Sequence, residues 1–121
     1  MPGSCLVPVS FGDPFAHFMF GYEFYFEEAE LSALETAFLG LVTHQTVVID
    51  CRNLKEIGSG LLGKLMKFGK RMGLDGNRFI LYNLQPNVYD IISITGHADG
   101  KLFLICTDFR SVRLATGLQP G

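Results

Sequence analysis

The 121-residue chain has no tryptophan and only three cysteines, and neither residue type suggests a site. Cys5, Cys51 and Cys106 are odd in number, far apart, and set in apolar runs such as VVIDC and LFLIC. This pattern argues against a disulfide framework and indicates buried free thiols in a reducing compartment. Histidine is equally sparse, with three residues that occur singly (His17, His44 and His97).

Because these histidines are scattered, we interpret each as a surface or core-edge residue rather than a base or a ligand. Clusters of Cys, His, Asp and Glu with metal-ligand spacing are also missing from the sequence. We therefore expect no metal site, no cofactor and no catalytic residues.

Basic residues are absent from the first 51 positions, which contain seven acids, while all ten Lys and Arg residues fall in 52–121. Two readings stay open: two solvated surfaces of opposite sign, or a polarised surface that attracts a charged protein partner. Nucleic acid is disfavoured as a partner because the basic residues are few and the pI is about 5.8.

The sequence has no uninterrupted apolar run long enough to span a membrane. Its longest aromatic stretch, FAHFMFGYEFYF, carries His17 and Glu23, and the N-terminal MPGSCLVPVSF lacks a basic leader. We expect a soluble cytoplasmic protein that does not associate with membranes. A length of 121 residues with 48% hydrophobic content suits one compact domain over 1–121.

Short apolar runs alternate with helical patterns along the whole chain. SCLVPVSF, interrupted by Pro8, predicts an edge strand, and FAHFMFGY predicts a second strand. TVVIDC, RFILYN and KLFLIC predict further strands, the first two buried on both faces, and residues 47–51, 79–82 and 102–105 are expected to be neighbours. The alternation predicts an α/β domain with a mixed, mostly parallel sheet of about five strands and about four helices.

Four helices follow from apolar residues at spacings of three and four positions. The first is expected from about Phe26, the second over 59–73, the third from Pro86, and the fourth after an N-cap at Thr107. The second has an apolar stripe of Leu61, Leu62, Leu65, Met66, Gly69 and Met72. Its remaining surface is basic, with Lys64, Lys67, Lys70 and Arg71.

The second helix opens with GSGLLG, residues 58–63, which matches the G-x-G-x-x-G dinucleotide pattern. That motif requires a tight turn directly after a strand, but seven residues separate Asp50 from Gly58. A nucleophilic serine is also disfavoured, because Ser59 lacks small residues two positions away on either side. We therefore expect no enzyme; a small nucleotide-binding enzyme using GSGLLG is the least favoured alternative, and Ser59 is predicted to cap the helix.

The order of these elements resembles a STAS domain, the fold of bacterial anti-sigma-factor antagonists and of sulphate-transporter tails. The resemblance covers residues 46–96, TVVIDCRNLKEIGSGLLGKLMKFGKRMGLDGNRFILYNLQPNVYDIISITG. In that family a strand ending in Asp or Asn leads through a loop to an Asp-Ser-Ser-Gly or Ser-Ser-Ala-Gly helix start. Without a gap, the family's aspartate falls on Gly58, its first serine on Ser59, and its phosphate-accepting second serine on Gly60.

The resemblance implies a non-catalytic domain that binds a regulatory protein, either an anti-sigma factor or a serine kinase, and so controls transcription indirectly. Phosphorylation of Ser59 is an alternative that requires the loop to shift by one residue. A scaffold or accessory subunit of a larger complex, without a phospho-switch, is the second alternative, and a homodimer is left open. The expected docking surface consists of Asn53, Lys55, Glu56, Gly58, Ser59 and Gly60, flanked by Lys64 and Lys67.

Overall fold

The computed structural model describes residues 6–10, 15–21, 28–41, 45–94 and 103–116. Five strands and four helices follow one another, alternating from the second strand onward: β1 (Leu6–Ser10), β2 (Ala16–Phe20), α1 (Glu28–Leu39), β3 (Thr46–Asp50), α2 (Ser59–Leu74), β4 (Arg78–Tyr82), α3 (Pro86–Ile94), β5 (Leu104–Cys106) and α4 (Phe109–Ala115). These elements confirm the predicted α/β class and all nine predicted elements. His44, His97 and Cys5 lie outside the described residues.

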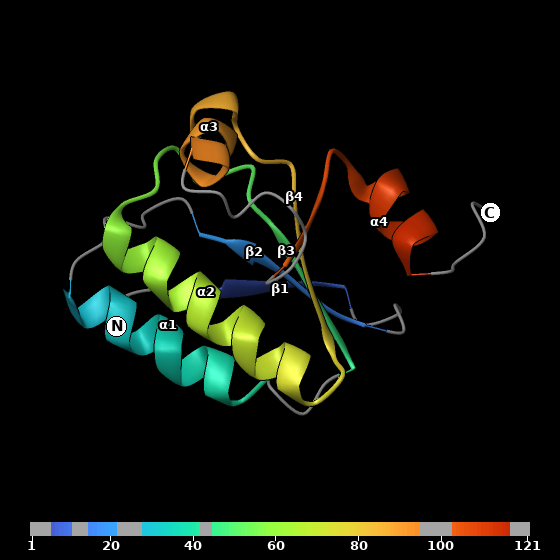
Figure 1. Ribbon diagram of the computed structural model, residues 1–121, viewed down its shortest axis with the longest axis horizontal. Helices are drawn as coiled ribbons and strands as arrows, with labels where there is room; N and C mark the ends of the chain where they lie inside the picture. Colours follow the sequence, from blue (N-terminus) through green and yellow to red (C-terminus); the bar gives the residue numbers. More distant parts are fainter. Residues whose placement is uncertain (1–5, 11–14, 22–27, 42–44, 95–102, 117–121) are drawn as a thin grey trace.

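The strands form one sheet in the order β1-β2-β3-β4-β5 (Figure 1). β1 pairs antiparallel with β2, and the other three pairings are parallel, which confirms a mixed, mostly parallel sheet. Pro8 lies on β1, at an edge of the sheet, where a residue without an N–H is tolerated. β3 and β4 lie inside the sheet, and their continuous apolar runs follow from cover on both faces.

Successive side chains of β3 and β4 point to opposite faces of the sheet and enter two separate clusters. Val47 and Ile49 join the larger cluster with α1, α2 and α3, whereas Val48 enters the smaller one beneath α4. In Figure 1, α1 and α2 lie side by side on one face, and α4 lies apart from them. One mostly parallel sheet is therefore covered by three helices on one face and by a single short helix on the other.

The larger cluster is aliphatic and phenylalanine-rich. On α2 the buried residues are Leu61, Leu62, Leu65, Phe68, Gly69 and Met72, while Met66 is only partly buried. The predicted apolar stripe of α2 is therefore confirmed except at Met66. The prediction omitted Phe68, which is also buried. Phe68 stacks on Phe38 of α1 at 4.3 Å between ring centroids, and Phe79 of β4 meets Phe68 edge-on at 4.8 Å.

The smaller cluster is built around aromatic rings and one histidine. His17 of β2 stacks on Phe109 of α4 at 5.0 Å, and its Nε2 atom lies 2.6 Å from the Tyr82 hydroxyl oxygen. His17 is 5% exposed, so our interpretation of it as a surface or core-edge residue is wrong. It is buried because α4 returns over this face of the sheet, a long-range contact that the spacing of histidines does not reveal.

Two boundaries near the C-terminal end differ from the sequence analysis. β5 has only three residues, and Leu104 is 40% exposed, because β5 lies at the other edge of the sheet. The N-cap of α4 is Asp108 rather than Thr107, since the Asp108 carboxylate accepts a 2.8 Å hydrogen bond from the Ser111 N–H. Within the described ranges, every helix is too short or too polar to cross a membrane.

Candidate protein-docking site

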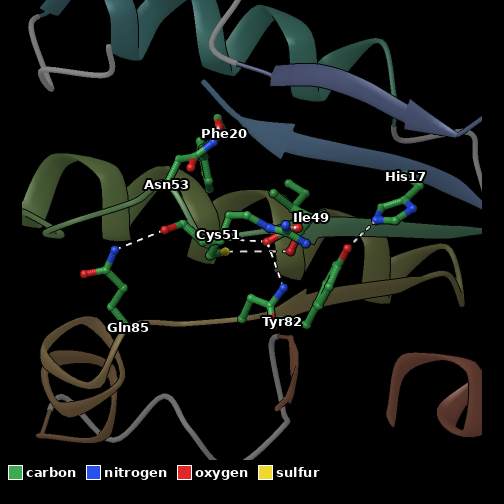
Figure 2. Close-up of polar contacts among 10 residues, drawn as sticks. His17, Phe20, Ile49, Cys51, Asn53, Tyr82 and Gln85 are labelled. Atoms are coloured by element: carbon green, nitrogen blue, oxygen red, sulfur yellow. Dashed lines mark hydrogen bonds and ion pairs between the residues drawn. The ribbon is translucent and has the colours of Figure 1, made fainter. Parts of the chain in front are cut away.

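The segment 51–58, which joins β3 to α2, is held in place by one of its own side chains and by two side chains that follow β4. Asn53 donates through Nδ2 to the Phe20 carbonyl oxygen at the end of β2, at 3.1 Å. Gln85 donates to the Arg52 carbonyl oxygen at 3.0 Å, and Asn87 donates to the Lys55 carbonyl oxygen at 2.6 Å. Figure 2 shows the Asn53 side chain pointing from this segment toward Phe20, and the Gln85 amide pointing toward the segment. We call residues 51–60 the docking loop.

A buried carboxylate fixes the beginning of the docking loop. Asp50, at the end of β3, is 1% exposed and accepts hydrogen bonds from the Arg52 backbone N–H at 2.9 Å and from Arg52 Nε at 2.6 Å. The Asn83 amide donates to it at 3.2 Å from the end of β4, and Asn83 has a left-handed backbone with φ 58°. The Asp50 charge, together with its hydrogen bond, raises the pKa of the Arg52 guanidinium.

Two apolar side chains anchor the middle of the docking loop. Leu54 and Ile57 are buried in the larger cluster, whereas Lys55 and Glu56 between them are exposed. The exposed surface continues through Gly58, Ser59 and Gly60 into the first turn of α2. The docking loop therefore presents a fixed polar surface rather than a free chain, so binding at this surface would require little further ordering of the backbone.

The start of α2 differs from our prediction at Ser59. The N-cap is Gly58, in the extended conformation with φ −100° and ψ 170°, and no side chain caps the helix. The Leu62 N–H bonds to the Gly58 carbonyl oxygen at 2.9 Å, so Ser59 is already the first helical residue. The prediction that Ser59 caps the helix is therefore wrong; helix propensity could not distinguish two adjacent small residues.

Lys64 and Lys67 do not face the docking loop; they extend from α2 toward α1. Both donate to the Glu35 carboxylate of α1, at 2.5 Å and 2.6 Å. The two ammonium groups lower the pKa of Glu35 to about 2, chiefly through these hydrogen bonds. The structure thus brings together six of the eight predicted residues, in Asn53, Lys55, Glu56, Gly58, Ser59 and Gly60, and places the two lysines between α1 and α2.

The thiol of Cys51 and the phenol of Tyr82 are held in their protonated forms. Burial, aided by the Asp50 charge, raises the pKa of the Cys51 thiol, whose Sγ lies 3.7 Å from the Ile49 carbonyl oxygen. Burial also raises the pKa of the Tyr82 phenol. Neither group can therefore supply an anionic nucleophile near neutral pH. Across the part of the chain that the structure describes, His, Cys, Asp and Glu do not gather into a metal site.

Sequence reasoning missed the residues that hold the docking loop, namely Arg52, Asn83, Gln85 and Asn87. A signal was present, because polar residues directly follow the two central strands in DCRN and YNLQPN. The carboxyl ends of neighbouring parallel strands meet at one edge of a sheet, which places these side chains close together. The same geometry separates Gly58, the first residue of GSGLLG, from the end of β3 by residues 51–57, so the tight turn of a dinucleotide fingerprint is not formed here.

This arrangement is that of a known class: the chain has the fold of STAS domains of the anti-sigma-factor antagonist type. One similar structure is an anti-sigma-factor antagonist (STAS) domain protein from Planctomyces limnophilus, with a TM-score of 0.77 and 18% identity, covering 93% of this chain and 97% of that one. Another is the anti-sigma factor antagonist SpoIIAA in its unphosphorylated form, with a TM-score of 0.71 and 12% identity, covering 94% and 98%. No family model matches the chain, and no curated protein matches its sequence.

Proposed function

We propose that the chain is a non-catalytic protein-interaction domain that acts as an anti-sigma-factor antagonist. In this proposal it binds an anti-sigma factor or a serine kinase in the cytoplasm, and thereby controls transcription indirectly. The whole of 1–121 forms one such domain, and it needs neither nucleic acid nor a membrane. Two proteins of similar structure are anti-sigma-factor antagonists, which supports the proposal.

The observation that carries the proposal is the fixed docking loop. Three amide side chains and the Asp50–Arg52 ion pair hold its backbone, while Lys55, Glu56, Gly58, Ser59 and Gly60 stay exposed. A preorganised polar surface with buried apolar anchors suits recognition of a folded partner. The protonated Cys51 thiol and Tyr82 phenol favour binding over catalysis.

Phosphorylation of Ser59 would regulate this surface. Ser59 is exposed in the first turn of α2, where a phosphate is favoured by the helix dipole. A phosphoryl group adds about −1.5 to −2 charges at neutral pH, enough to disturb a complementary interface. In this sequence Gly60, which has no hydroxyl group, occupies the position of the family's acceptor serine. We therefore propose that a partner kinase modifies the neighbouring Ser59.

A scaffold or accessory subunit without a phospho-switch is the second candidate, and Gly60 favours it. This residue stands where the family carries its phosphate acceptor. A Cβ atom on Gly60 would lie 2.9 Å from Leu31 Cδ1, so α1 packs closely against this position. Under this alternative the docking loop binds its partner constitutively.

The test is binding of Ser59→Asp to the anti-sigma factor or serine kinase encoded nearest to this gene, measured by calorimetry. Leu114→Asp is the matched control, because it adds the same charge to an exposed residue of α4. We expect Ser59→Asp to weaken binding about tenfold or more and Leu114→Asp to leave it unchanged. Equal effects of the two variants would overturn the docking site. Incubation with the kinase and ATP, followed by mass spectrometry of Ser59, separates the switch from the scaffold.

A further inference from the structure

A groove lies between α1 and α2, away from the docking loop and near the C-terminal halves of both helices. Its volume is about 340 Å³, and its lining residues are Glu35, Phe38, Leu39, Lys64, Lys67, Phe68 and Arg71. The stacked rings of Phe38 and Phe68 are buried beneath it, whereas Leu39 is 64% exposed at its side. The groove therefore has an apolar base formed by aromatic and aliphatic carbon.

The charged side chains around this groove are mostly positive. Three cations and one carboxylate line it, and Glu35 is engaged by Lys64 and Lys67. Arg71 is 61% exposed, and its ion pair with Asp75 is long, at 3.9 Å. A long exposed pair of this kind contributes little, so the Arg71 guanidinium is available to a planar anion that it can bind with two hydrogen bonds.

The dimensions of the groove favour a small ligand over a protein. Sites for small molecules begin at about 300 Å³, and a stable protein interface covers about 800 Å² on each partner with several large apolar anchors. Beside the groove the exposed surface of α1 consists of small residues, Ser32, Ala33, Thr36 and Ala37. Only Leu39 supplies a large exposed apolar side chain along this edge of α1.

We propose that this groove binds a carboxylic acid with an unbranched apolar tail, of the medium-chain fatty acid class. The tail lies over Phe38 and Phe68, and the carboxylate pairs with the Arg71 guanidinium beside the Lys67 ammonium. Burial of the tail supplies most of the affinity, and the net positive lining selects an anion over a neutral or cationic amphiphile. This site is independent of the docking loop and holds whether or not the proposed antagonist function is correct.

The experiment titrates sodium decanoate, below its critical micelle concentration, into the full chain and follows backbone amide shifts by NMR. We expect saturable binding with one site, and shifts concentrated in 35–39 and 64–71. Decanol and decyltrimethylammonium carry the same tail without the negative charge, and they should bind about fivefold or more weakly. Equal binding of decanol, or shifts concentrated elsewhere, would overturn the proposal.

Two variants and one control test the residues. Arg71→Glu should weaken decanoate binding about tenfold, and Leu39→Glu, which places a carboxylate beside the groove, should weaken it similarly. Lys70→Glu is the control, because Lys70 is exposed on the same helix but does not line the groove. If Lys70→Glu weakens binding as much as Arg71→Glu, only the overall charge of α2 matters and the site is wrong.

An anionic membrane surface is another source of negatively charged headgroups with apolar tails, and vesicles of phosphatidylglycerol test for binding to it. We expect no co-sedimentation of the chain with these vesicles, because the groove accepts a single tail. Co-sedimentation that Lys70→Glu and Arg71→Glu abolish equally would assign the basic helix to a membrane surface and overturn the proposal. All three variants change exposed side chains, and unchanged melting curves will show that they fold.

Discussion

The two faces of the sheet are covered by different chemistry. On one face, three helices bury a cluster made of aliphatic residues and phenylalanine, with Cys51 as its one sulfhydryl. On the other, the seven residues of α4 cover a cluster that includes Tyr82, Cys106 and the His17 ring. The first face is stabilised mainly by buried apolar area, and the second by a few specific contacts. We therefore expect different substitutions to destabilise each face.

Leu65→Asp should have the largest effect, because it places an unpaired charge in the larger cluster. Leu65 is fully buried on α2, and an uncompensated buried charge costs several kcal/mol, about as much as the whole stability of a small domain. We expect loss of the cooperative melt in circular dichroism. Leu114→Asp makes the same chemical change at an exposed position and should cost less than about 0.5 kcal/mol. A native melt of Leu65→Asp would show that this face of α2 is misassigned.

Tyr82→Phe should destabilise the α4 face by about 1–3 kcal/mol. The change removes only the hydroxyl that lies 2.6 Å from His17 Nε2, a contact that Figure 2 shows across the sheet. Urea denaturation measures the cost, and faster amide exchange in α4 than in α2 would locate it. The control is Tyr89→Phe, at an exposed tyrosine of α3. Equal costs for the two variants would show that the buried pair adds nothing.

Asp108→Ala should cost about 1 kcal/mol, because it removes the N-cap of α4. The hydrogen bond from the Ser111 N–H lowers the pKa of Asp108. The stabilisation is therefore full above the carboxyl's ordinary pKa and declines as the pH falls below it. Thr107→Ala should cost less, since the Thr107 hydroxyl contacts only the Ser111 hydroxyl, at 3.2 Å. The reverse ranking of these two variants would restore Thr107 as the cap.

Glu35 should make a smaller, pH-dependent contribution to the packing of α1 on α2. Its pKa is lowered from 4.5 to about 2, so the carboxylate stabilises the folded chain fully above pH 4.5. That stabilisation should disappear as the pH falls toward about 2, and high salt should reduce it. Urea denaturation of the wild type and of Glu35→Gln across this range measures it. A stability difference that is independent of pH would contradict the assignment.

The sequence predicted the apolar face well because its pattern is local. The stripe on α2 and the two-sided strands β3 and β4 follow from spacing alone, since each helix or strand carries its own apolar pattern. The α4 face was not predictable in this way. His17 and Tyr82 are 65 positions apart, and their contact exists only because two strands and a returning helix meet.

The docking loop is an intermediate case. Its exposed residues were found through the resemblance to STAS domains, whereas its supports, Gln85 and Asn87, follow a different strand. Ser59 shows the limit of local reasoning, because the prediction missed the N-cap by one residue. In a Gly-Ser-Gly sequence the backbone can begin a helix at either of two positions, and packing of the following turn decides between them.

The smallest predicted effect concerns the start of α2, where the N-cap is a glycine without a side-chain partner. Gly58 has φ −100° and ψ 170°, a conformation open to any residue, and a Cβ atom there would meet nothing within 4 Å. Gly58→Asp should therefore stabilise the fold by about 0.5–1 kcal/mol, since a carboxylate caps the first-turn N–H groups and restricts the unfolded chain.

Gly58→Ala separates these two contributions, because alanine restricts the unfolded chain but cannot cap. We expect it to be about 0.5–1 kcal/mol less stable than Gly58→Asp in urea denaturation, and the gap should close at low pH as the new carboxylate is protonated. Equal stability of the two variants would mean that the first turn of α2 does not accept a cap. The whole gain of Gly58→Asp over the wild type would then come from the restricted unfolded chain.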